Sequence, residues 1–295
     1  MSAAGSLTIS ARFAGGRLAD LRVTLCRPPV ARLFQQQIPE AVVKTVPYLF
    51  TLCAHAQRAA AQAALAAAEG SERRAVDDGE LWIEYLHENL WRLLLDWPAA
   101  LGQPDARDAF VAWRGERNSR AVIERTQEAL QAVRTSACAC LPQLGTEEAP
   151  TATRLDPQIW LDYWRGDADR RPPPQCPVSV AAAYCRRLAE TEQAARALAA
   201  GAPCPVAAAG GQGWGVGQAL TARGVLTHAV HVEEGRIINY QVWAPTDALF
   251  ADAGALAQLL GEGHYASAEA ARQALNLAVL ALDPCLPYTL ELKNA

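Results

Sequence analysis

The residues of this chain best suited to chemistry are its eight cysteines, because thiolates are strong ligands for soft metal ions. None of them forms a Cys-x-x-Cys pair. In the one close pair, Cys138 and Cys140, a single intervening residue places the two thiols on different faces of a helix. A zinc ribbon or an iron–sulfur cluster built from local pairs is therefore not expected. A metal site here must take its ligands from segments far apart in the sequence.

Two cysteines stand in settings that could present a ligand. Cys285 lies in the loop Asp-Pro-Cys-Leu-Pro-Tyr over residues 283–288, where a proline on either side fixes the direction of the side chain. Cys53 lies near the start of an alanine-rich helix expected over about 47–69, and a helix N-terminus lowers the pKa of a thiol. A buried apolar cysteine is the ordinary alternative for both. The other six have no partner pattern and are interpreted as structural: Cys26, Cys138, Cys140, Cys176, Cys185 and Cys204.

Other candidate motifs favour ordinary structural roles. The glycine-rich segment 209–217 lacks the Gly-Lys-[Ser/Thr] of a phosphate-binding P-loop, so we interpret it as a tight loop whose backbone closely approaches another group. His228 and His231 fall on opposite faces of an expected strand, so they cannot share a metal ion without a bulge. His55, two residues after Cys53, is offset by about 200° around a helix and makes a poor chelating partner.

Helices and strands are both needed to position these residues. Alternating apolar and polar residues predict two strands within 7–26, joined at Gly15-Gly16, and a second hairpin at about 224–243. Pro98 is expected to stop one helix, and Ser267 to cap another. The segment 142–177 is expected to be irregular. Helices are predicted over about 47–69, 79–96, 120–140, 178–200, 249–261 and 267–282. The fold class is therefore α+β and mostly helical.

Composition excludes several classes of protein. The chain has 295 residues, of which 51% are hydrophobic and 20% charged, so disorder and a small disulfide scaffold are excluded. A net charge of −4 argues against binding to nucleic acid or to an anionic membrane. The N-terminus has no secretory signal pattern, and no run of about 18 apolar residues predicts a membrane-spanning helix. We therefore expect a cytoplasmic protein whose thiols stay reduced.

Taken in order, the motifs resemble those of the large subunit of nickel–iron hydrogenases. Residues 221–228 (Thr-Ala-Arg-Gly-Val-Leu-Thr-His) and 235–246, which end in Val-Trp-Ala-Pro-Thr, resemble that family's Arg-Gly-x-x-x-His and Val-Pro-[Ser/Thr] hairpin. Asp-Pro-Cys at 283–285 resembles the start of its terminal motif. The likeness covers roughly residues 5–65 and 210–291. It implies a single hydrogenase large-subunit-like domain over 1–295, with a divergent helical middle at about 70–205.

Departures from that pattern bear on the metal. In the family, four thiolates bind nickel, and two of them also bridge to an iron that carries two cyanides and one carbon monoxide. Here Phe50 and Tyr288 stand at the positions of two of the four cysteines, while Gln57 and Glu291 stand at the positions of two histidines. With half of its soft ligands lost, the site is not expected to hold nickel. The resemblance therefore implies an iron fragment alone.

The resemblance also assigns roles to the residues that remain. Cys53 and Cys285 would ligate the iron, Arg223 and Thr246 would donate hydrogen bonds to its cyanides, and Pro245 would shape the pocket wall. Charge-assisted donors are what an anionic ligand needs in a dry pocket. Cys53 matches a bridging position, whereas Cys285 matches a terminal nickel-ligand position. Ligation of iron by both sulfurs therefore requires a local shift of the last loop.

This pattern resembles the hydrogenase expression/formation proteins called HupK or HoxV, degenerate relatives of the large subunit. The stretch Leu-Leu-Leu-Asp-Trp-Pro at 93–98 is similar to a motif of that family. The resemblance implies a non-catalytic scaffold that assembles or carries an iron–dicyanide–carbonyl fragment before it enters the large-subunit precursor. The implied partners are a HypC-type chaperone, a HypD-containing assembly complex and that precursor. Two alternatives remain: a metal-free protein that docks the chaperones by mimicking the large subunit, and a divergent redox-active hydrogenase.

Overall fold

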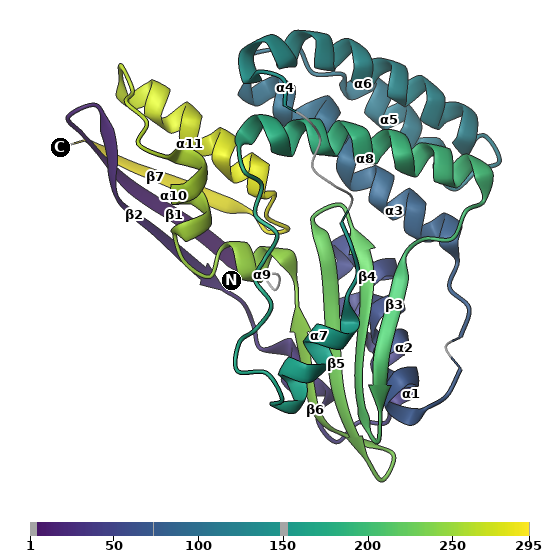
Figure 1. Ribbon diagram of the computed structural model, residues 1–295. Helices are drawn as coiled ribbons and strands as arrows, with labels where there is room; N and C mark the ends of the chain where they lie inside the picture. The colour runs from purple at the N-terminus through teal and green to yellow at the C-terminus, as the bar shows by residue number, and fades with distance from the viewer. Residues whose placement is uncertain (1–4, 73, 148–152, 295) are drawn as a thin grey trace.

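The computed structural model describes residues 5–72, 74–147 and 153–294, which form two β-sheets and a helical bundle (Figure 1). The N-terminal sheet has the order β2-β1-β7, from β1 (Ser6–Ala14), β2 (Arg17–Cys26) and β7 (Tyr288–Asn294). The second sheet is an antiparallel meander of β3 (Val206–Gly211), β4 (Trp214–Thr221), β5 (Gly224–Glu233) and β6 (Arg236–Trp243). Both expected hairpins are therefore confirmed.

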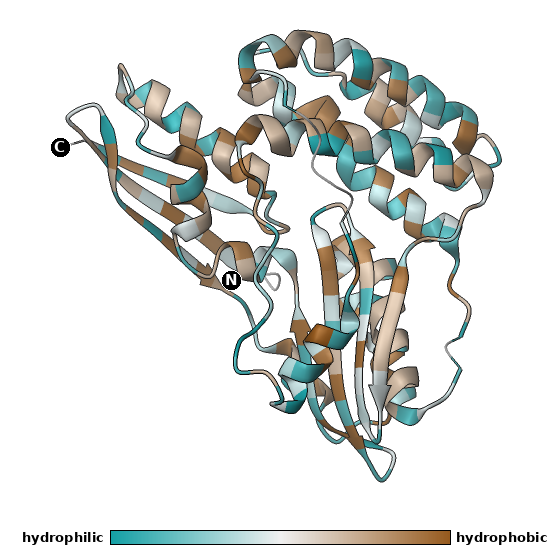
Figure 2. Cartoon of the chain, viewed as in Figure 1, coloured by the Kyte–Doolittle hydropathy of each residue, from teal (hydrophilic) through white to brown (hydrophobic). Residues whose placement is uncertain are grey.

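The N-terminal hairpin forms because its apolar residues alternate with polar ones, as Figure 2 shows along β1 and β2. Leu7 and Ile9 are buried against α11 (Ala268–Leu282), which Ser267 caps as predicted by accepting the backbone N–H of Ala270. Strand β7 was not predicted. It pairs with β1 in parallel, with Leu7 opposite Tyr288, so the two ends of the chain are joined in one sheet.

The glycine-rich segment is not a loop, and that prediction was wrong. It forms the β3–β4 hairpin, and the glycines of β4 lie directly against α2 (Ala54–Glu69). A Cβ atom on Gly215 would lie 2.0 Å from the carbonyl oxygen of Ala64, and one on Gly217 would lie 2.1 Å from that of Ala60. The expected close approach of the backbone is therefore real, but a helix makes it. This contact fixes α2, and with it Cys53, against the second sheet.

Around Cys53 the chain is more broken than predicted. In place of one helix over 47–69, the structure has the end of α1 (Pro39–Leu49), the 3₁₀ turn η2 (Thr51–Cys53) and then α2. A short 3₁₀ helix, η1 (Val30–Phe34), precedes α1. Pro47 lies within α1 rather than at a helix start. Phe50 adopts a non-helical conformation between α1 and η2, so the chain breaks just before Cys53.

The middle of the chain is a bundle that covers one end of the second sheet (Figure 1). Pro98 does not stop its helix, contrary to expectation: the π-helical turn η3 (Arg92–Asp96) joins α3 (Asp78–Trp91) to α4 (Trp97–Ala100), and Pro98 lies in the first turn of α4, where no N–H is needed. The other bundle helices are α5 (Arg107–Glu116), α6 (Val122–Leu144) and α8 (Val180–Ala200).

Three shorter helices complete the described chain. Helix α7 (Pro157–Arg165) lies within the segment expected to be irregular, and it packs its tryptophans on the second sheet. The helix expected over 249–261 is instead two helices, α9 (Pro245–Leu249) and α10 (Gly254–Leu260). No helix in the described ranges is long and apolar enough to cross a bilayer. The predicted α+β, mostly helical class is confirmed.

The contact between β4 and α2 can be tested at Gly217. We expect Gly217→Ala to lower the free energy of unfolding by about 1–3 kcal/mol, because the added methyl group must push α2 off the sheet. Gly115 in α5 is the control, since a Cβ atom there meets no other atom within 4 Å. Gly115→Ala should be neutral or stabilise by up to about 1 kcal/mol. Urea denaturation measures both, and equal losses would contradict the close approach.

Candidate functional site

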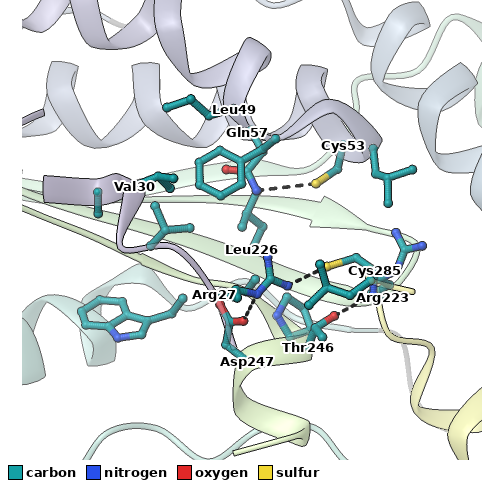
Figure 3. A pocket seen from close by; sticks show the side chains of 18 of the residues that line it. Arg27, Val30, Leu49, Cys53, Gln57, Arg223, Leu226, Thr246, Asp247 and Cys285 are labelled. Atoms are coloured by element: carbon teal, nitrogen blue, oxygen red, sulfur yellow. Dashed lines mark hydrogen bonds and ion pairs between the residues drawn. The ribbon is translucent and has the colours of Figure 1, made fainter. Parts of the chain in front are cut away.

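All five residues singled out from the sequence line one cavity of about 500 Å³ (Figure 3). They come from η2, the β4–β5 turn, the start of α9 and the loop after α11. The five are Cys53, Arg223, Pro245, Thr246 and Cys285. The fold therefore brings together thiols from opposite ends of the chain, together with a guanidinium and a hydroxyl group.

Cys53 is the N-cap residue of α2, but the helix terminus does not activate its thiol. The carboxylate of Glu84, on α3, accepts the backbone N–H groups of His55 at 2.8 Å and Ala56 at 2.9 Å. Burial, with this carboxylate beside it, raises the pKa of Cys53 to about 12. The prediction of a lowered pKa was therefore wrong, because another side chain already uses the free N–H groups of the helix.

A chain of buried neutral groups ends on the Cys53 sulfur. The Tyr240 hydroxyl lies 2.6 Å from Nδ1 of His228, and Nε2 of His228 lies 2.8 Å from Oε1 of Gln57. The amide nitrogen of Gln57 donates to Cys53 Sγ at 3.5 Å. Burial lowers the pKa of His228 to about 3, so the imidazole stays neutral. His228 is thus a packing residue, as expected, and it orients the one donor that reaches Cys53.

The hydrogen-bond partners of Cys285 differ from those of Cys53. Its backbone N–H donates to Oγ1 of Thr246 at 3.1 Å, and Nη2 of Arg27 donates to its sulfur at 2.8 Å. Arg27 also forms an ion pair with Asp247, with 2.5 Å between Nε and Oδ1. Sequence reasoning missed Arg27, which follows directly on β2, because its partners Cys285 and Asp247 are more than two hundred residues away.

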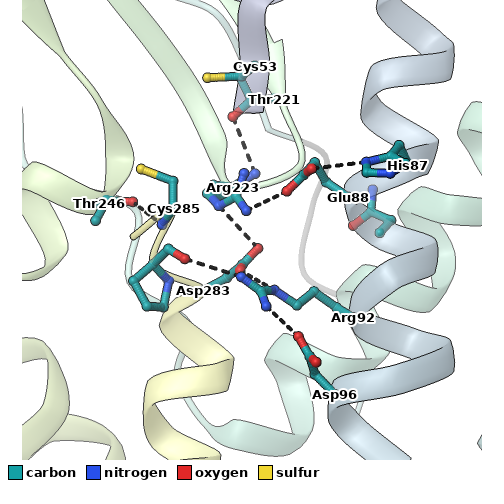
Figure 4. Close-up of polar contacts among 12 residues, drawn as sticks. Cys53, His87, Glu88, Arg92, Asp96, Thr221, Arg223, Thr246, Asp283 and Cys285 are labelled. Carbon is teal, nitrogen blue, oxygen red and sulfur yellow. Dashed lines mark hydrogen bonds and ion pairs between the residues drawn. The ribbon is translucent and has the colours of Figure 1, made fainter. Parts of the chain in front are cut away.

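Behind the cavity wall, the buried carboxylate of Asp283 gathers three guanidinium groups, and Figure 4 shows those of Arg92 and Arg223. Asp283 accepts from Nε of Arg92 at 2.6 Å and from Nη2 of Arg187 at 2.7 Å, and it lies 3.6 Å from Nε of Arg223. Arg223 also donates to Glu88 at 2.6 Å. Burial alone would raise the pKa of Asp283, but the three arginines hold it far below its usual range.

Two buried groups of this wall keep hydrogen-bonding capacity that their neighbours in the described chain do not use. Nε of Arg223 is buried and has no hydrogen-bond partner in the part of the chain that the structure describes. The hydroxyl of Thr246 accepts from Cys285, which leaves its proton for another acceptor. Arg223 and Thr246 are both buried, so a donor there meets little competition from water. These groups suit a small anion.

The positions that depart from the hydrogenase pattern take other roles. Phe50 puts an apolar ring on the cavity wall. Tyr288 does not line the cavity: it begins β7 and donates its hydroxyl to Asn276 at 2.9 Å. Glu291 lies in β7 opposite Ser10. Among the described residues no group of three or more His, Cys, Asp and Glu side chains could hold a metal ion.

No family model matches the sequence. The chain is 30% identical to the hydrogenase expression/formation protein HupK of Azotobacter vinelandii, over 99% of this chain and 100% of that protein. The chain belongs to the HupK family. It is 27% identical to the hydrogenase expression/formation protein HupV of Azotobacter chroococcum mcd 1, over 99% of this chain and 100% of that protein. Membership of the HupK family confirms the resemblance found in the sequence.

The HupK fold also has relatives among solved structures. The Ni-Fe-Se hydrogenase of D. vulgaris Hildenborough in the reduced state superposes with a TM-score of 0.60 at 14% identity, covering 92% of this chain and 94% of that one. At such low identity the likeness shows the fold alone, and the expected hydrogenase large-subunit-like architecture is confirmed. The likeness spans the helical middle as well, where the sequence showed only a short motif at 93–98.

Asp283 should dominate the stability of the site. We expect Asp283→Asn to lower the free energy of unfolding by about 3–5 kcal/mol, because it leaves buried guanidinium groups without their counter-charge. Asp20→Asn is the control, since Asp20 pairs with Arg12 on the surface and should matter little. Chemical denaturation at pH 7 measures both variants. An Asp283→Asn protein as stable as the control would contradict this account of the cluster.

Glu84 should make stability fall as the pH rises. Burial raises its pKa to about 7, so the folded protein holds a proton that the unfolded chain, with a pKa of about 4.5, releases. This contribution is full below pH 4.5 and is lost as the pH rises to about 7. We expect Glu84→Gln to flatten the slope of unfolding free energy against pH in this interval. Urea denaturation at several pH values measures this slope. An unchanged slope in Glu84→Gln would mean that the proton held by the folded protein is not on Glu84.

Proposed function

We propose that this HupK-family protein acts in hydrogenase maturation, as a scaffold that carries an iron–dicyanide–carbonyl fragment and passes it to the large-subunit precursor. The fragment is cargo, and no turnover is proposed. A HypC-type chaperone and a HypD-containing complex would deliver it, in the cytoplasm. The name that its HupK relatives carry, hydrogenase expression/formation protein, supports the role in maturation. The residues that line the cavity support the proposal that the cargo is an iron fragment.

The observation that carries this proposal is the meeting of two thiols with two buried donors in one cavity. Cys53 and Cys285 offer soft ligands for iron, while Arg223 and Thr246 offer a charged donor and a hydroxyl. Iron-bound cyanide is an anion that accepts hydrogen bonds, so its desolvation in this cavity needs such donors. The donor set matches the cargo in number and kind, and it requires no further ligand from the protein.

The protonation state of the Cys53 thiol suits a protein that holds the iron fragment only temporarily. A thiol must lose its proton to bind a metal, so protons compete with the cargo at this sulfur. Because burial raises the pKa of Cys53 to about 12, that competition is strong at neutral pH. The sulfur is ready to be reprotonated when the fragment leaves. A resident metal centre would gain from the opposite arrangement.

The cavity also argues against nickel as cargo. Nickel in the related hydrogenases uses four thiolates, and only two sulfurs line this cavity among the described residues. Phe50 adds no ligand and makes its wall apolar. This arrangement supports the carriage of an iron fragment over hydrogen chemistry by the protein itself.

A metal-free docking role is the second candidate function, and an exposed apolar rim favours it. Leu33, Tyr48 and Leu52 are 61%, 82% and 42% exposed, and they belong to η1, α1 and η2, whose other residues line the cavity. Exposed apolar groups of this kind are typical of interaction sites. In this role the protein would bind the chaperones by likeness to the large subunit, and its cysteines would be dispensable.

The two roles can be separated at the cysteines. The protein is purified without oxygen from a host that expresses the maturation machinery, and its infrared spectrum is recorded. We expect cyanide and carbonyl stretching bands in the wild type and their loss in Cys53→Ala and Cys285→Ala. The control Cys138→Ala changes an exposed thiol on α6 and should keep the bands.

Two outcomes would count against the scaffold. Absence of the bands from the wild type, with the full machinery present, would refute carriage of the fragment. Full hydrogenase maturation in hosts carrying either cysteine variant would favour docking alone.

A further inference from the structure

We propose that Arg27 is a positioning residue for the second thiol: it holds the Cys285 sulfur in place and offsets its negative charge when the sulfur bonds the cargo. This inference rests on the proposed function and adds to it a residue that neither the sequence motifs nor the family name assigns. It depends on one contact, the hydrogen bond of 2.8 Å from Arg27 Nη2 to Cys285 Sγ.

The fold holds Arg27 in this position from two sides. Its own backbone leaves β2 just before Pro28-Pro29, so the chain at that point has little freedom. Its guanidinium lies between Cys285 and Asp247, whose side chain is 32% exposed, while that of Arg27 is 22% exposed. The ion pair therefore forms in a partly desolvated place, where it is stronger than a surface pair.

These contacts close into a ring around the cavity mouth, as Figure 3 shows. Arg27 bonds the side chain of Cys285, and the backbone N–H of Cys285 bonds Thr246. Asp247 follows Thr246 in α9 and pairs with Arg27. Because both the backbone and the side chain of Cys285 are held by this ring, the direction of its sulfur is fixed without a metal.

The two sulfurs are thereby made unequal. Cys53 receives a neutral amide donor at 3.5 Å, whereas Cys285 receives a cationic donor at 2.8 Å. Hydrogen bonds from a cation to a sulfur anion are stronger than those from a neutral donor. In a loaded site, such a bond also withdraws electron density from the sulfur and so from the iron. Iron with less electron density donates less to carbon monoxide, which raises the carbonyl stretching frequency.

The contact itself is tested on the empty protein, expressed without maturation genes. Melting temperatures are measured for Arg27→Gln, Cys285→Ala and the double variant. If Arg27 acts through Cys285, the melting temperature of the double variant falls by less than the sum of the decreases in the two single variants. The control pair joins Cys285→Ala to Arg17→Gln, which removes an exposed ion pair with Glu262, and should be additive. Additive losses in the Arg27 pair would overturn the positioning role.

The effect on cargo is tested on protein from the maturation-competent host. We expect Arg27→Gln to weaken retention of the iron fragment by about 10- to 100-fold, as other residues that support metal ligands do. The fragment that remains should show a lower carbonyl stretching frequency. Arg27→Lys keeps the charge but loses the planar guanidinium group. Its retention of the fragment and its carbonyl frequency should therefore lie between those of the wild type and of Arg27→Gln.

The results distinguish this inference from the proposed function. Full retention and an unshifted carbonyl band in Arg27→Gln would overturn the inference and leave the scaffold intact. A wild type without cyanide and carbonyl bands would refute the scaffold. In that case the melting temperatures alone decide whether Arg27 holds Cys285.

Discussion

The buried carboxylate of Asp283 is the interaction on which the site depends. It neutralises guanidinium groups from η3, α8 and the β4–β5 turn, so it ties the bundle to the second sheet. Moving any one of these elements would separate a buried guanidinium group from the Asp283 carboxylate, and breaking a buried ion pair costs several kcal/mol. Two residues further on, the chain places Cys285 in the cavity. The geometry of a thiol and of Arg223 is therefore set by the same charge.

One face of a single bundle helix carries three of the side chains that support the site. Glu84, Glu88 and Arg92 follow one another at intervals of four residues, so they share a face of α3 and its continuation. Glu84 occupies the N-terminus of α2, Glu88 binds Arg223, and Arg92 binds Asp283 and the carbonyl of Pro284. The π-helical turn begins at Arg92, and such turns often occur at functional sites. A region with little sequence likeness to hydrogenases thus still supports the cavity.

A feature of the fold or of the site could be predicted from the sequence where its determinants are local. Alternation over 7–26 and the cap at Ser267 predicted real elements, because their determinants lie within a few residues of each other. Strand β7 was missed because its only partner is β1, at the other end of the chain. The thiol of Cys53 was misjudged for the same reason: its pKa depends first on burial by distant parts of the fold and then on Glu84, about thirty residues away. Arg27 belongs to no local pattern at all.

The cavity is lined by two unlike kinds of side chain, and their difference bears on how the proposed cargo would lie. Arg223 and Thr246 bring buried hydrogen-bond donors to the lining, while Leu49, Phe50 and Leu226 bring apolar surface. Anionic cyanides gain from donors, whereas carbon monoxide is nearly apolar and gains nothing from them. In the proposed complex, the favoured orientation would turn the cyanides toward Arg223 and Thr246 and the carbonyl toward the apolar groups. Selection among the three diatomic ligands would then follow from the polarity of the cavity lining, without any specific contact to the carbonyl.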